Sequence, residues 1–132
     1  EPPIKFGDIC SLSDRVRISD GKYLKLWGKR VKTDNNFGDI NRRINGKVSG
    51  FGAPLIHKDA VFPTLVSNSH YYAFDDCGII KNEEYTKVSS FPSDYNFLNV
   101  EPKYLMGMSV PPVMTARVAN QIYEQWFKNP KR

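Results

Sequence analysis

Hydrophobic positions recur at helical spacing near both ends of the chain. Near the start, a short helix is predicted in which one face is shared by Tyr23, Leu24 and Trp27. Ser19 or Asp20 caps this helix, and Gly28 ends it. Because a short helix in a small domain buries one apolar stripe, we expect this face to pack against the core.

The clearest helical pattern lies near the end of the chain. Ser109 is a suitable N-cap, and Pro111 and Pro112 fit the first turn of a helix that runs to about Phe127, because amides in that turn lack intrahelical acceptors. An apolar residue recurs every four positions along it: Met114, Val118, Ile122 and Trp126. We expect this stripe to be exposed within the chain, or to be covered by self-association.

The middle of the chain is typical of strands. We predict strands over residues 61–66, 70–74 and 78–80, with a turn between the last two. Pro63 places the first strand at a sheet edge, because proline lacks the amide that a central strand donates.

A further helix is predicted to follow these strands, with Asn82 as its cap and Phe91-Pro92 as its stop. Glu83 and Glu84 then lie in its first turn, where the helix dipole favours acidic groups. Together these elements predict an α+β fold, a small mixed β-rich domain with short helices.

Residues 29–53 show neither helical nor strand periodicity, and they are polar, glycine-rich and basic. We predict a long loop region here, with one hairpin turning at Asn45-Gly46. Loops of this length are usually functional or disordered.

Charge is unevenly distributed along the chain. Residues 15–47 contain ten Lys/Arg and three acids, whereas residues 59–101 contain seven acids and two lysines. This distribution indicates that one surface faces a polyanion, and a solvated lysine-rich surface is the alternative.

Other kinds of site have little support in the sequence. Cys10 and Cys77 form no metal-ligand pattern and at most one disulfide, and we expect two reduced thiols. His57 and His70 are too isolated for a zinc site. No apolar run is long enough for a membrane span, and the first residues do not resemble a signal peptide.

Three stretches resemble cytosine-5 DNA methyltransferases. Residues 84–97, which include Phe91-Pro92, resemble motif IX, and Gly107-Met108-Ser109-Val110-Pro111-Pro112 resembles motif X. Upstream, Pro63-Thr64-Leu65 resembles the point where the target-recognition domain rejoins the common fold. Their order and spacing are specific to the family. The resemblance covers residues 61–127, and the preceding residues fit the variable target-recognition segment.

The sequence departs from the family pattern in both motifs. Glu83 and Lys87 replace arginines in motif IX, and Leu105 and Met108 replace glutamine and asparagine in motif X. The family's asparagine borders the S-adenosylmethionine pocket. A contact with that cofactor would therefore come from backbone groups or from Ser109.

The family's catalytic residues are absent from this chain. The resemblance implies a cysteine nucleophile in a Pro-Cys dipeptide and a glutamate in Glu-Asn-Val, and neither motif occurs here. A glycine-rich cofactor turn is also missing. We expect no methyl transfer by the chain alone, with S-adenosylmethionine serving only the complete enzyme. The chain is then a subunit of a split enzyme or an excised fragment. We expect it to be cytoplasmic and associated with the nucleoid. The sequence does not tell whether the enzyme belongs to a restriction-modification system.

The resemblance implies three parts: a linker from the catalytic half (1–17), a target-recognition domain (18–99), and motif X with a terminal helix (100–132) that packs on a missing α/β catalytic domain. Double-stranded DNA and the catalytic half are the implied partners. The candidate DNA-binding residues are Lys29, Arg30, Lys32, Asn41, Arg42, Arg43, Lys47 and Ser67. Among the residues of the basic segment, Arg42 and Arg43 are the best candidates for base reading, and adenine could also be read by Asn35, Asn36, Asn41 and Asn45. The competing hypothesis is a non-enzymatic basic module that binds RNA or a protein.

Overall fold

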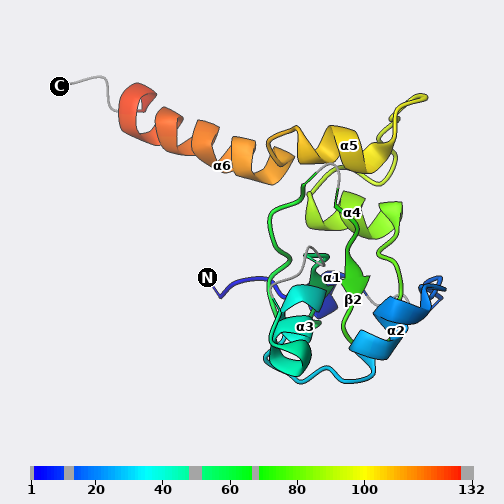
Figure 1. Ribbon diagram of the computed structural model, residues 1–132. Coiled ribbons are helices and arrows are strands. Elements are labelled where there is room, and N and C mark those ends of the chain that lie inside the picture. Colours follow the sequence, from blue (N-terminus) through cyan, green and yellow to red (C-terminus); the bar gives the residue numbers. More distant parts are fainter. Residues whose placement is uncertain (1, 11–13, 48–51, 67–68, 129–132) are drawn as a thin grey trace.

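Two short parallel strands, β1 (Leu55–Ile56) and β2 (Tyr72–Ala73), lie at the centre of the fold (Figure 1). The computed structural model describes residues 2–10, 14–47, 52–66 and 69–128. Leu55 pairs with Tyr72, and Ile56 pairs with Ala73. Since successive side chains of a strand point to opposite faces, the first pair contributes to one hydrophobic cluster and the second pair to another.

The larger cluster packs α1 (Phe6–Ile9), α4 (Asn82–Val88) and α5 (Pro102–Gly107) against one face of the strands. Its buried members are Phe6, Cys10, Ile56, Tyr71, Ala73, Ile80, Tyr85 and Met106. The segment predicted to be a linker therefore contributes two core side chains. The α+β class is confirmed, but the β-rich part of the prediction is wrong, because helices form most of the regular structure among the described residues.

The smaller cluster packs α2 (Gly21–Trp27) and α3 (Phe37–Asn45) against the other face. The α2 prediction is confirmed: the Asp20 side chain accepts a hydrogen bond from the Lys22 amide, and Gly28 is the C-cap. The loop prediction for residues 29–53 is wrong, because α3 lies within it.

Helix α3 is specified by its ends and by its buried face. The Asn36 side chain accepts a bond from the Asp39 amide at the start, and Gly46 ends the helix in the left-handed region at φ 65°. The predicted hairpin turn is therefore a helix C-cap. Phe37 and Ile40 are fully buried between these ends.

The strand predictions are confirmed only in part. A turn joins β2 to residue 79, where Tyr72 and Ile79 form a single antiparallel bridge. Residues 61–66 form no strand. There the Tyr71 hydroxyl accepts a bond from the Val66 amide and donates to the Thr64 carbonyl. These two backbone groups are therefore satisfied by a side chain and not by a neighbouring strand.

The terminal helix α6 (Pro112–Ile122) continues into a π-helical turn, η1 (Tyr123–Phe127), and extends away from the rest of the chain (Figure 1). Pro111, rather than Ser109, occupies the N-cap position. The predicted stripe is exposed: 58% of Met114, 51% of Val118, 48% of Ile122 and 74% of Trp126 remains accessible. Among the described residues, no helix is long and apolar enough to cross a bilayer.

Candidate nucleic-acid interface

A basic cleft of about 290 Å³ lies between α2 and α3. Its lining residues are Lys22, Lys25, Leu26, Lys29, Asn41, Ile44 and Asn45. Helical spacing gathers the three lysines, because positions 22, 25 and 29 recur every three or four residues. None of the three forms an ion pair with another residue in the described ranges. Unneutralised ammonium groups are suited to a phosphodiester backbone.

Arg43, a predicted DNA contact, is engaged within the protein. Its guanidinium donates to both carboxylate oxygens of Asp34, at 2.6 and 3.4 Å, and to the Lys29 carbonyl at 2.7 Å. Asp34 is only 4% exposed and also accepts from the Val31 amide. Arg43 therefore ties α3 to the segment before it.

The carboxyl of Asp34 has a pKa below its ordinary value. Burial works against ionisation, but the hydrogen bonds from Arg43 and the Val31 amide outweigh it. Because the folded pKa is depressed, this stabilisation is present above the unfolded pKa and is lost as pH falls through the folded value.

Arg30, another predicted DNA contact, is also held internally. Its guanidinium carbon lies 3.7 Å from the centre of the Trp27 ring and 5.0 Å from that of Phe74. The same group donates to the carbonyls of Trp27 and Asp75. Its charge therefore interacts favourably with both rings.

The other candidates divide between interior and surface. Asn41 is buried and donates to the Lys47 carbonyl. Arg42 is exposed in the last turn of α3, and Lys29, Lys32 and Lys47 are exposed as well. Ser67 lies outside the described residues.

Ser109, the candidate cofactor contact, is exposed, and its hydroxyl donates to the Met106 carbonyl within its own turn. The predicted contact between Ser109 and S-adenosylmethionine stays a prediction.

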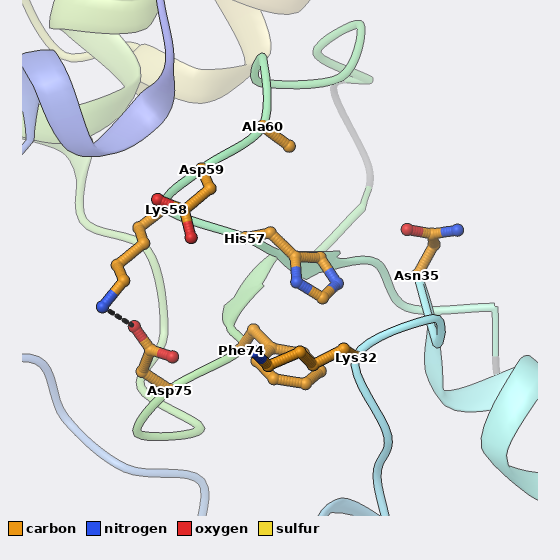
Figure 2. A pocket seen from close by; sticks show the side chains of 8 residues that line it. All are labelled: Lys32, Asn35, His57, Lys58, Asp59, Ala60, Phe74 and Asp75. Carbon is orange, nitrogen blue, oxygen red and sulfur yellow. Dashed lines mark ion pairs between the residues drawn. The ribbon is translucent and has the colours of Figure 1, made fainter.

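A second, polar pocket of about 560 Å³ lies beside the same basic segment (Figure 2). It is lined by Lys32, Asn35, His57, Lys58, Asp59, Ala60, Phe74 and Asp75. Figure 2 shows the His57 ring above the Phe74 ring, with Asn35 on one side and Asp59 on the other. The ring centres of His57 and Phe74 are 4.1 Å apart, and the two rings are stacked.

No sequence pattern indicates this pocket, because His57, Asp59 and Phe74 belong to no motif. The pocket unites residues from three separate segments, so no local spacing indicates it. Of the residues that line the pocket, Asn35 is one that the sequence already indicates as able to read adenine.

The two cysteines are free and buried, as expected for small apolar side chains. Burial raises the pKa of each thiol to about 11, with Glu84 adding to the effect at Cys10 and Asp76 at Cys77. Since the thiolate is the reactive form, neither thiol is suited to act as a nucleophile. In the described part of the chain, no cluster of three or more His, Cys, Asp or Glu residues could hold a metal ion.

These pKa values predict a loss of stability at alkaline pH. The unfolded thiols ionise from pH 9.0, whereas the folded ones stay protonated until about pH 11, so this contribution is lost as pH rises between the two. Urea unfolding below pH 9 and near pH 11 measures the change. Tyrosines also ionise in this range, so a Cys10→Ala/Cys77→Ala variant is the control. An equally steep decline in that variant would contradict the prediction.

Comparisons with protein-family models, curated proteins and solved structures found no match for this chain. Its function must therefore be inferred from its own residues.

Proposed function

We propose that this chain is the target-recognition portion of a cytosine-5 DNA methyltransferase, which binds duplex DNA and positions it for methylation of a flipped cytosine. The observation that carries the proposal is the order and spacing of the motif IX-like and motif X-like stretches, followed directly by a helix whose apolar stripe stays exposed in the part of the chain that the structure describes. In such an enzyme the flipped base enters the catalytic half.

The exposed helix α6 supports the catalytic half as a partner. Four apolar side chains on one stripe are about half or more exposed, although isolated proteins rarely leave such patches bare. The proline pair at the start of α6 lies where the motif X resemblance places it, at the opening of the final helix. In this proposal α6 packs on the surface of the catalytic half, and the catalytic half binds S-adenosylmethionine.

The basic cleft supports duplex DNA as the other partner. Several arginines of the basic segment are engaged internally, including Arg30 and Arg43, while its lysines remain exposed. Lysine ammonium groups contact phosphates regardless of sequence, so the cleft supplies affinity and register. Exposed Arg42 lies on α3 beside the cleft-lining Asn41 and belongs to the same proposed surface.

Replacing the cleft lysines is expected to weaken DNA binding and its salt dependence. Each phosphate contact contributes roughly 0.9 to the slope of log affinity against log salt, so Lys22→Gln/Lys25→Gln/Lys29→Gln should reduce the slope by up to ~2.7. Fluorescence anisotropy with a duplex at several salt concentrations measures the slope.

A matched pair of single variants provides the control. Lys25 and Lys87 each lie in the last turn of a seven-residue helix, but only Lys25 lines the cleft. Lys25→Gln should reduce the slope and Lys87→Gln should not. Equal effects of the two variants on the slope would mean that the cleft is only a solvated surface. Preferential binding of RNA or of a protein over duplex DNA would favour the non-enzymatic module.

A further inference from the structure

We infer that base reading is carried out in the polar pocket around His57, where Asn35 and Asp59 read amino-bearing base edges. This assignment rests on the proposed function and names the residues that would supply its specificity. It moves that role away from Arg43, whose guanidinium is already occupied by Asp34.

The pocket offers side-chain groups that are free to bind. Within the described ranges, the side-chain amide of Asn35 and the carboxylate of Asp59 form no hydrogen bond or ion pair, although the backbone amide of Asn35 donates to Asp39. An amide matches the adjacent donor and acceptor of adenine, and a carboxylate accepts from the amino group of cytosine. The lysine cleft lacks carboxylates, so it contacts phosphate without distinguishing bases.

His57 supplies a further acceptor at a fixed position. Its Nε2 lies 2.9 Å from the Asp34 carbonyl, and because a carbonyl only accepts, Nε2 carries the proton. In this tautomer Nδ1 is the acceptor. The ring is held in place by Phe74 beneath it and by the Asp34 backbone, which Arg43 anchors through the Asp34 carboxylate.

One segment joins the two sites. Lys29 lines the phosphate cleft, while Lys32 and Asn35 line the pocket. In the proposed arrangement, the duplex contacts the cleft through its backbone and the pocket through its base edges. Arg43 is a positioning residue in this arrangement, because it holds the segment that carries Lys29 of the cleft and Asn35 of the pocket.

The test is selection from a library of duplexes with a randomised stretch, using the full chain, followed by affinities for the enriched duplex and its single-base derivatives. Asn35→Ala and Asp59→Asn should each abolish discrimination at one position, a loss of roughly 5- to 150-fold. Both variants should leave the salt slope unchanged. Asp94→Asn, an exposed acid outside the pocket, is the matched control.

The outcomes separate the two proposals. If the wild-type chain enriches no sequence and does not bind duplexes, the proposed function fails and takes this assignment with it. If the wild-type chain enriches a sequence and both variants keep the same base preference, only the pocket assignment is overturned. Arg43→Gln should disturb the same positions, since it releases Asp34 and with it the His57 ring.

Discussion

Replacing Arg15 with methionine is expected to lower the free energy of unfolding by about 3–5 kcal/mol, because it leaves a buried carboxylate without its partner. The Arg15 guanidinium bonds Glu84 three times, at 2.6, 3.0 and 3.1 Å. The side chain of Glu84 is 0% exposed and that of Arg15 is 8% exposed. Since small domains are stable by only about 5–15 kcal/mol, this loss is a large share of the total.

The pair joins segments far apart in the chain. Arg15 precedes α2, whereas Glu84 lies in the first turn of α4 and also accepts from the Lys81 amide. Hydrogen bonding to Glu84 raises the pKa of Arg15, although burial of the guanidinium opposes this. The charged pair therefore fixes the N-terminal segment against α4.

Two further variants keep this prediction testable. Arg15→Met/Glu84→Gln should recover part of the lost stability, because the amide keeps the bond from Lys81 and carries no charge. Asp76→Asn should cost less than about 1 kcal/mol, since Asp76 is 30% exposed and makes a single 3.3 Å contact with Arg15. Urea unfolding measures all three, and a wild-type midpoint for Arg15→Met would contradict the account.

Charged substitutions in the apolar stripe of α6 and η1 are expected to weaken assembly with the proposed catalytic half while leaving the chain's own stability unchanged. Ile122→Asp and Trp126→Asp should each weaken the complex on the order of 30-fold or more, as buried apolar anchors at interfaces do. Both side chains are exposed in the chain alone, so its unfolding should not depend on them.

The two measurements are the affinity for the catalytic half, by calorimetry, and the unfolding midpoint of the chain alone. Asn120→Asp, on the same helix but away from the stripe, is the control for added charge. A lower unfolding midpoint for Trp126→Asp would show that the stripe packs within this chain or against a second copy. Unchanged affinity would remove α6 from the interface.

Helices with strong local signals were predictable from the sequence. Asp20 and Gly28 mark the ends of α2, and the four-residue apolar repeat marks α6. Helix α3 was missed because Gly38, Asn41 and Asn45 are poor helix formers. Its stability comes from packing of Phe37 and Ile40 in the smaller cluster, which propensity does not report.

The candidate site was predictable only in outline. Its basic character follows from composition, but the sequence does not tell which cations are free. In the sequence, nothing distinguishes Arg30 and Arg43 from the exposed cations next to them. In the structure, Arg30 contacts the Phe74 ring and Arg43 is bonded to Asp34. Contacts between distant segments decide these roles, and no local pattern encodes them.

Methyl transfer by a reconstituted pair tests the central claim most directly. The purified chain is mixed with a catalytic half that carries the Pro-Cys and Glu-Asn-Val motifs and lacks motif X, and labelled methyl groups from S-adenosylmethionine are counted in duplex DNA. The account predicts site-specific methylation by the mixture and none by either component alone. Methylation by this chain alone, or no methylation by a mixture whose catalytic half is folded and binds S-adenosylmethionine, would contradict it.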